Sequence, residues 1–241
     1  RDGYDFELSR PVVDGCHNVV NAFYCGMVKT INEIRDILDI SYENNFNNLR
    51  DSFVDTFYDN EKKLFTDTEK SNHSALHSNI IPLFYDLVPE EAEGSIVNLV
   101  KEKRLSCGVY MSYFVLKALA NIEEYELIYD LITCKDKHSW GNMIKEGATT
   151  CFEAWGKDQK WNTSLCHAWA SSPIPVLIED IIGLTPEEPG WKKINFNPNL
   201  PEKLEELNLK FKVNTGIIKV EYKDNNFNIS FPEKVQLNLN Y

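Results

Sequence analysis

The spacing of apolar residues changes once along this 241-residue chain, and the change limits what the chain can fold into. Up to about Gly183, apolar residues recur at the spacing of amphipathic helices, whereas from Trp191 onward they alternate, as in strands with one buried face. Between these regions lies a segment rich in Pro and Gly, 183–190, which is predicted to continue neither a helix nor a strand. We therefore predict two structural units, residues 1–190 and residues 191–241.

The first unit is predicted to be a set of helical hairpins. One apolar stripe predicts a helix of roughly 25 residues that buries the stripe against a neighbour. The members of this stripe are Val20, Phe23, Tyr24, Met27, Ile31, Ile34 and Leu38. Further helices are predicted over 46–57, 73–87, 90–103, 109–121 and 123–134. A last helix is predicted after Ser172, whose hydroxyl can cap it while Pro173 occupies the first turn. Short loops between such helices favour antiparallel hairpins.

The second unit is predicted to be a small antiparallel sheet. Apolar and polar residues alternate in three runs, 218–222, 227–231 and 235–239. Asp224, Asn225 and Asn226 supply a turn between the first two runs. The alternation predicts that one face of this sheet is buried and the other is wet.

Charge and hydropathy exclude two classes of partner. Lys and Arg number 25 against 37 Asp and Glu, which gives a formal net charge of −12, and no local run supplies a basic face. A protein that neutralises phosphates needs such a face, so we expect no nucleic-acid partner. No stretch of the sequence approaches the roughly 20 apolar residues of a membrane span, so we expect no membrane partner.

The cysteines and histidines predict neither a disulfide framework nor a metal site. The six cysteines are widely spaced, without a C-x-x-C pair: Cys16, Cys25, Cys107, Cys134, Cys151 and Cys166. We expect reduced thiols and a cytoplasmic location. His73 and His77 lie four residues apart on one predicted helix face, but no third ligand is apparent. We therefore predict no metal and no cofactor.

Residues 140–169 point to carbohydrate chemistry. This segment carries four of the five tryptophans together with Glu153, Asp158 and His167. Sugar C–H faces stack on aromatic rings, and glycoside cleavage needs a carboxylic acid and a carboxylate. Clustered tryptophans also fit core packing. The composition of the segment therefore leaves both interpretations open.

The segment 147–155 reads G-A-T-T-C-F-E-A-W and resembles the G-A-T-T-x-W-E-x-W signature of the bacterial α-L-rhamnosidases, glycoside hydrolase family 78. Further segments resemble this family in the same order: 21–24 its N-A-F-Y-Y helix, 165–173 its His-containing segment, 182–186 its G-[IL]-x-P turn and 196–201 its P-N-L-P entry to a C-terminal β-domain. Ordered matches over most of the chain make this resemblance specific.

The resemblance implies the fold. The family's catalytic domain is an (α/α)6 barrel of twelve helices, followed by a β-sandwich. The chain has fewer predicted helices, so it resembles the C-terminal half of that barrel plus the terminal β-domain. We therefore expect a mainly α fold, with residues 1–190 as a partial (α/α)6 barrel of helical hairpins. Residues 191–241 are then a small antiparallel β-domain.

The resemblance also implies the chemistry. Members of the family release terminal α-L-rhamnose from rhamnose-containing glycosides with inversion, and Glu153 matches the position of their general base. Their general acid lies in a motif resembling D-x-P-x-R-D-E, which is absent from this sequence. We therefore expect the acid outside this chain, in the missing N-terminal half of the barrel, and we expect the chain alone to be inactive.

The predicted site has one catalytic residue, Glu153, on a loop at one end of the hairpins, in an open aromatic-lined groove. Its predicted substrate-binding residues are Trp140, Phe152, Trp155, His167 and Trp169. Phe152 departs from the tryptophan that the family often has, which bears on sugar preference. From the residues alone, Glu153 could instead cap a loop, and His167 and Trp169 could be core residues.

Two other functions stay open at this stage. One is a non-catalytic carbohydrate-binding or scaffold module, for which a missing acid is no defect. The other is an (α/α)6 hydrolase or phosphorylase that acts on a different sugar.

Half a barrel exposes apolar helix faces, and large apolar patches drive association. We therefore also expect a homodimer or another form of self-association.

Overall fold

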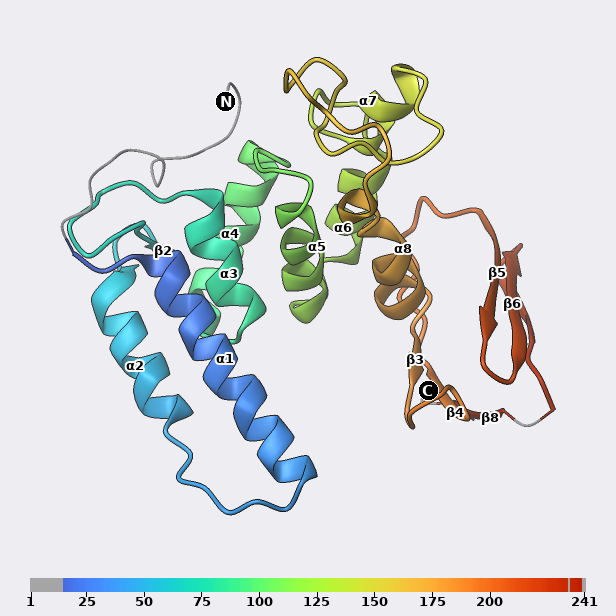
Figure 1. Cartoon of the computed structure of the whole chain (residues 1–241), viewed down its shortest axis with the longest axis horizontal. Helices are drawn as coiled ribbons and strands as arrows, with labels where there is room; N and C mark the ends of the chain where they lie inside the picture. The colour runs from blue at the N-terminus through green and yellow to red at the C-terminus, as the bar shows by residue number, and fades with distance from the viewer. Residues whose placement is uncertain (1–14, 234, 240–241) are drawn as a thin grey trace. The chain divides into compact units, whose positions relative to one another are not determined.

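The computed structural model describes residues 15–233 and 235–239, which fall into two compact units (Figure 1). The first unit ends at Ser171 and the second begins at Ser172. This division lies upstream of the periodicity change because the helical segment 173–181 packs on strand β3 (Leu184–Pro186), which in turn pairs with β4 (Lys193–Phe196). Among the described residues, no helix is both long and apolar enough to cross a bilayer.

Helical hairpins build the first unit, as predicted. Its helices are α1 (Asn18–Ile37), α2 (Phe46–Phe57), α3 (Leu76–Phe84), α4 (Glu90–Lys103), α5 (Met111–Asn121), α6 (Tyr125–Thr133) and α7 (Trp140–Lys145), with a small hairpin of β1 (Tyr58–Asp59) and β2 (Leu64–Phe65) after α2. Helices α1, α3 and α5 are neighbours in one layer, and α2, α4 and α6 each pack on the helix before them. This arrangement is that of a partial (α/α)6 barrel, which confirms the predicted fold class.

The packing of α1 differs from the prediction. Its buried residues are small or polar, Asn18, Ala22, Cys25, Gly26 and Asn32. A Cβ on Gly26 would lie 2.3 Å from the Tyr85 ring, so only glycine lets this ring approach the helix.

The apolar stripe of α1 is therefore exposed instead of buried. Its members with heptad spacing are each between 38% and 66% exposed: Val20, Tyr24, Met27, Ile31, Ile34 and Leu38. Spacings of four and three residues are those of a seam that packs against another helix. The periodicity correctly predicted an amphipathic helix, but the described chain supplies no helix to cover this face.

A buried carboxylate organises the start of α3. Asp67 is 1% exposed. Its Oδ1 accepts hydrogen bonds from the Ala75 N–H (2.8 Å) and the Ser78 hydroxyl (2.6 Å), and its Oδ2 lies 2.7 Å from Nδ1 of His73. His73 thus precedes the helix, which begins at Leu76, so the predicted helical face shared with His77 does not form. Asp67 joins the loop before α3 to the first turn of that helix.

The second unit begins with a short helix, α8 (Pro173–Val176), that continues as a π-helical turn, Leu177–Ile181. Pro173 occupies the first turn as predicted, but the Ser172 hydroxyl does not cap the helix. Gly183 follows with φ +72°, and a Cβ there would lie 1.7 Å from the Asn197 carbonyl oxygen. Glycine is therefore required where the chain turns into β3.

Two three-stranded sheets complete the second unit. One has the order β3–β4–β8 and the other the order β5–β6–β7, with β5 (Glu206–Val213), β6 (Gly216–Lys223), β7 (Asn226–Ser230) and β8 (Gln236–Leu239). The sheet of β5, β6 and β7 is antiparallel as predicted, and Asp224 and Asn225 at its turn have positive φ. The predicted strand at 235–239 forms, but it pairs parallel with β4. The segment 183–190, predicted to be irregular, contains strand β3.

A separate apolar core holds the two sheets. Its buried members are Ile182, Leu184, Ile194, Phe196, Val213, Ile218, Val220 and Val235. Phe196 also makes an edge-on contact with Phe227, with ring centroids 5.1 Å apart. Each such buried side chain contributes about 1.5–3 kcal/mol to folding.

Replacement of Asp67 by alanine is expected to destabilise the chain by roughly 3 kcal/mol, because it strands two buried donors and the His73 ring nitrogen. Urea unfolding followed by circular dichroism measures this loss. The matched control is Asp51→Ala, at an exposed position of α2, which should change the unfolding free energy little. Equal stability of the two variants would contradict a structural role for Asp67.

The exposed stripe of α1 is expected to make the 241-residue chain self-associate at high micromolar concentration. The double substitution Met27→Lys and Ile31→Lys places two charges in the seam and should shift the chain to a monomer in light scattering. Ile144→Lys, at a residue of α7 that is 72% exposed, is the control and should leave the mass unchanged. A strictly monomeric unmodified chain would contradict this expectation.

Candidate active site

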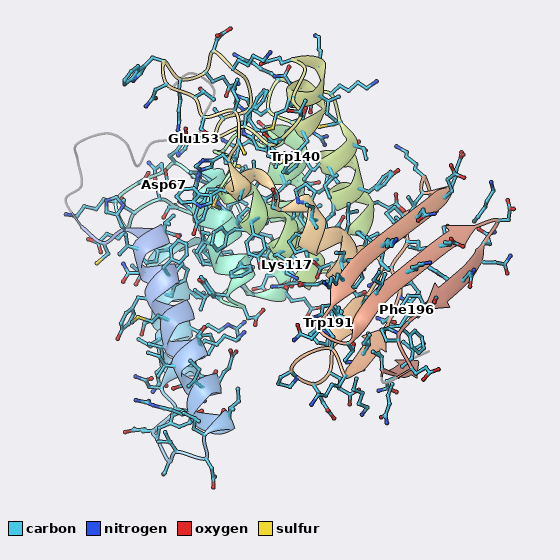
Figure 2. The ribbon with its side chains drawn as sticks, turned by 45° about the vertical axis from the view of Figure 1, so that its right-hand side comes forward. Asp67, Lys117, Trp140, Glu153, Trp191 and Phe196 are labelled. Atoms are coloured by element: carbon cyan, nitrogen blue, oxygen red, sulfur yellow. The ribbon has the colours of Figure 1, made fainter. Side chains whose placement is uncertain are left out.

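Glu153 lies on the long loop that follows α7, at one end of the helices (Figure 2). Two stretches of this loop pair with each other through backbone hydrogen bonds. The Glu153 N–H donates to the Ser164 carbonyl (2.8 Å), and the His167 N–H donates to the Cys151 carbonyl (2.8 Å). The predicted loop location of Glu153 is therefore confirmed, and the pairing places Glu153 and His167 on adjacent stretches.

The Glu153 carboxylate is held at both oxygens. Lys160 Nζ donates to Oε1 (2.8 Å), and the Ser164 N–H donates to Oε2 (3.1 Å). The pKa of Glu153 is lowered, most of all by the hydrogen bond from Lys160 and then by the Ser164 N–H and by the electrostatic effects of Lys160 and His167. Partial desolvation opposes this shift. The Glu153 side chain keeps 29% exposure. The geometry thus presents an ionised, solvent-accessible carboxylate.

Three of the predicted sugar-binding rings are buried. Trp140, Phe152 and Trp155 are 8%, 2% and 0% exposed. The indoles of Trp140 and Trp155 meet edge to face at 5.0 Å, and their N–H groups donate to the carbonyls of Ala170 (2.6 Å) and Cys107 (2.6 Å). Rings packed in this way offer no free face to a sugar, so in this structure they support the loop instead of lining a groove.

Two other rings are exposed: Trp169, which was predicted to bind the substrate, and Tyr110, which was not. Trp169 is 62% exposed and lies 5.1 Å from the His167 ring and 5.1 Å from the Tyr110 ring. His167 is half-buried, and its Nε2 is buried without a hydrogen-bond partner among the described residues. A buried nitrogen of this kind is costly unless something bonds to it. The arrangement brings a carboxylate, a ring nitrogen with free bonding capacity and two exposed rings into one region.

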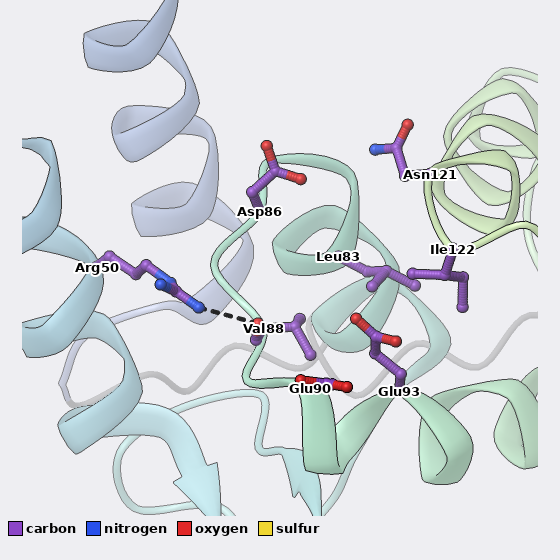
Figure 3. Close-up of a pocket in the computed structure, with 8 residues that line it drawn as sticks. All are labelled: Arg50, Leu83, Asp86, Val88, Glu90, Glu93, Asn121 and Ile122. Carbon is purple, nitrogen blue, oxygen red and sulfur yellow. Dashed lines mark hydrogen bonds between the residues drawn. The ribbon is translucent and has the colours of Figure 1, made fainter.

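A cavity of about 470 Å³ lies elsewhere in the first unit (Figure 3). It is lined by Arg50, Leu83, Asp86, Val88, Glu90, Glu93, Asn121 and Ile122. Burial and the nearby Glu90 charge raise the pKa of Glu93. Asn121 ends α5, whereas Tyr110 precedes its first residue, so this cavity lies at the far end of α5 from Trp169. It is therefore not part of the site around Glu153.

Sequence reasoning missed three groups that shape the site. Lys160 belongs to a polar loop in which nothing distinguishes one lysine from another, and Ser164 acts through its backbone N–H. Tyr110 lies 43 residues before Glu153, so only the fold brings its ring to Trp169. Among the described residues, no cluster of three or more His, Cys, Asp or Glu side chains could hold a metal ion.

Two family models match the chain. The model of the bacterial α-L-rhamnosidase six-hairpin glycosidase domain matches residues 13–181, and the model of the bacterial α-L-rhamnosidase C-terminal domain matches residues 183–240. The two matches meet close to Gly183, where the chain turns into β3. Together they cover both described units.

Two relatives are similar in sequence. The chain is 25% identical over 176 residues to an α-L-rhamnosidase of Alteromonas sp. (strain LOR), an alignment that covers 68% of this chain and 19% of the relative. It is 25% identical over 205 residues to an α-L-rhamnosidase of Formosa agariphila, with 77% and 21% coverage. The chain thus spans about a fifth of the length of these relatives.

Solved structures share the fold. The α-L-rhamnosidase of Dictyoglumus thermophilum has a TM-score of 0.75 at 22% identity, over 90% of this chain and 26% of that chain. The Streptomyces avermitilis α-L-rhamnosidase complexed with L-rhamnose has a TM-score of 0.74 at 18% identity, over 91% and 22%. The six-hairpin model covers well over half of the sequence. The chain therefore belongs to the bacterial α-L-rhamnosidase family of six-hairpin glycosidases.

Proposed function

We propose that this chain is part of a glycoside hydrolase that releases terminal α-L-rhamnose from rhamnose-containing glycosides, with Glu153 as the general base of an inverting reaction. Family membership and the two α-L-rhamnosidase relatives support the reaction class. The observation that carries the proposal is that Lys160 and the Ser164 N–H keep the Glu153 carboxylate ionised, within the segment 147–155 that resembles the family's signature. The proposal concerns the whole protein.

In the proposed reaction, Glu153 accepts a proton from a water molecule as that water attacks the anomeric carbon. Attack occurs on the face opposite the aglycone, the bond from the anomeric carbon to the aglycone oxygen breaks, and the configuration inverts. A base must be unprotonated before it can act. The lowered pKa of Glu153 keeps its carboxylate unprotonated. Each carboxylate oxygen accepts one hydrogen bond and can still accept another from water.

We propose that the general acid comes from outside this chain. Inverting enzymes place their two carboxyl groups about 6.5–9.5 Å apart, and the acid protonates the departing oxygen. The Glu153 carboxylate is held by Lys160 and the Ser164 N–H, neither of which is a carboxyl group, and the sequence lacks the D-x-P-x-R-D-E motif. A base without its acid explains why the isolated chain is expected to be inactive.

His167 is proposed to bind the substrate. Its Nε2 is buried without a partner among the described residues, while its backbone N–H is fixed by the Cys151 carbonyl. A sugar hydroxyl can both donate and accept, so it can satisfy this nitrogen in either tautomer. The ring also contacts Trp169, which holds its plane.

Glu153→Gln in the full-length protein is expected to lower the kcat for an aryl α-L-rhamnoside by about 10²–10⁴-fold, because the amide cannot accept the proton from water. Initial-rate measurements at saturating substrate test this. Asp158→Asn, at an exposed carboxylate in the same loop, is the matched control and should retain the kcat. Unchanged turnover in Glu153→Gln would end the catalytic assignment. Retained rhamnose binding without hydrolysis by the unmodified protein would favour a carbohydrate-binding module.

Lys160→Met is expected to move the acidic limb of the kcat/KM profile to higher pH. Lys160 favours the charged form of Glu153 and lowers its pKa, so its removal raises that pKa. The base is then protonated earlier as the pH falls, and activity is lost sooner on the acid side. Lys157→Met, at an exposed lysine in the same loop, should leave the limb in place. Coincident acidic limbs for Lys160→Met and the unmodified enzyme would refute this role.

A further inference from the structure

We propose that Glu146, at the end of α7, is a positioning residue that holds Lys160 against Glu153 by fixing the turn between them. This inference rests on the proposed function and adds to it a residue that the sequence motifs do not mark. Glu146 lies just before the segment 147–155 that resembles the family signature. Its role is exerted through the backbone of residues 155–157.

The Glu146 carboxylate joins α7 to the loop that follows it. Glu146 comes directly after the last residue of the helix and is half-buried. Its Oε1 accepts a hydrogen bond from Nδ2 of Asn142 (2.9 Å), and its Oε2 accepts one from the Lys157 N–H (2.7 Å). Hydrogen bonds to a carboxylate are stronger than those between neutral groups. One oxygen is thus bonded to the helix and the other to the loop.

Asn142 reinforces this junction from the preceding turn of α7. Its Nδ2 donates a second hydrogen bond to the Trp155 carbonyl (2.9 Å). Its backbone N–H donates to the hydroxyl of Ser139 (3.0 Å), which caps the helix. Asn142 and Glu146 are four residues apart, a spacing at which side chains of a helix meet. Together they bind the loop backbone at residues 155 and 157.

Gly156 lies between these two bonded backbone groups. It is buried, and a Cβ at this position would lie 2.8 Å from Oε1 of Glu146. Any other residue at 156 would therefore displace the carboxylate from its place. Glycine here lets Glu146 reach the Lys157 N–H.

The fixed backbone continues to Lys160. The Trp155 N–H donates to Oε1 of Gln159 (3.1 Å), and the Gln159 N–H donates to the Gly156 carbonyl (3.3 Å). Lys160 follows directly, and its Nζ reaches Oε1 of Glu153, seven residues earlier, at 2.8 Å. The turn thus brings the lysine back to the glutamate.

The contact between Lys160 and Glu153 needs this support. The Lys160 side chain is 45% exposed. Holding an exposed lysine in one geometry costs conformational entropy, which offsets much of what an exposed ion pair gains. A backbone that is already fixed reduces this cost, because fewer torsions remain to be ordered. Glu146 therefore favours the conformation in which Lys160 acts on the base.

The charge of Glu146 and its positioning role predict opposite changes in the pKa of Glu153. As a like charge, Glu146 can only raise that pKa through space, so loss of this charge alone would lower it. Loss of the Lys160 contact would raise it, because the Lys160 hydrogen bond is the largest cause of the lowered pKa. His167, which also lowers the pKa, is unchanged in either case. The direction of the shift therefore distinguishes the two effects.

Carbodiimide cross-linking of the full-length protein measures the contact itself. The reagent joins a carboxyl group to a neighbouring amine with loss of water, and mass spectrometry of the peptides quantifies the product of Lys160 and Glu153. Glu146→Ala is expected to lower the yield about tenfold, a population change that one hydrogen bond to a charged group can supply. Lys145→Ala, at the exposed neighbouring position, is the matched control and should keep the yield.

Glu146→Gln keeps the size of the side chain and one acceptor oxygen, so it serves as the test if Glu146→Ala does not fold. Its yield is also expected to fall, because an amide cannot accept hydrogen bonds from both donors. Loss of the product in Glu153→Gln confirms which carboxyl group is joined. An unchanged yield in a folded Glu146 variant overturns the positioning role.

The pH profile of kcat/KM gives the second measurement. Glu146→Ala is expected to move the acidic limb to higher pH, as in Lys160→Met, whereas Lys145→Ala should leave it in place. When Lys160 is already methionine, Glu146→Ala should cause no further rise. A limb moved to lower pH, or a further rise in the double variant, would overturn the inference. Cross-linking requires no catalysis, so turnover retained by Glu153→Gln would refute the base and leave the contact measurement valid.

Discussion

The indole N–H of Trp155, bonded to the carbonyl of Cys107 at 2.6 Å, is the contact on which the rest of the candidate site depends. It joins the loop after α7 to the segment before α5, and the edge-on Trp140 ring fixes the second side of the same indole. A buried hydrogen bond of this kind leaves two unsatisfied groups when it breaks. The loop is therefore anchored by side chains within the protein, while Glu153, two residues before Trp155, stays at the surface.

This arrangement explains why the tryptophans of segment 140–169 predicted the sugar-binding residues only in part. Rings buried beneath a loop determine its conformation, and rings at its edge remain available to a ligand. Trp140 and Trp155 belong to the first kind, and Trp169 belongs to the second. The charged pair of Glu153 and Lys160 is partly exposed, so solvent weakens the attraction between the two charges, but the pair still lowers the pKa of the base.

Periodicity predicted the helices and most strands because it reports which face of each element avoids water. It failed where a partner decides the outcome. The spacing of the α1 stripe predicts a buried face, but within the described chain this face is exposed. The strand at 235–239 pairs parallel with β4, and alternation of apolar and polar residues cannot predict the direction of the neighbouring strand. At the site, the motif around Glu153 located the carboxylate. Tyr110 could not be found in this way, because it is far from the motif in the sequence and its ring contacts Trp169 only through the packing of α5.

The unequal burial of the tryptophans gives the protein a built-in optical reporter. Indoles shielded from water emit at shorter wavelengths than hydrated ones, and only the hydrated ones are reached by iodide. Trp140 and Trp155 thus provide a constant blue background, while Trp161 and Trp169 emit to the red. Since Trp161 lies in the loop and Trp169 beside His167, selective shielding of one red component would identify which side of the loop a sugar covers.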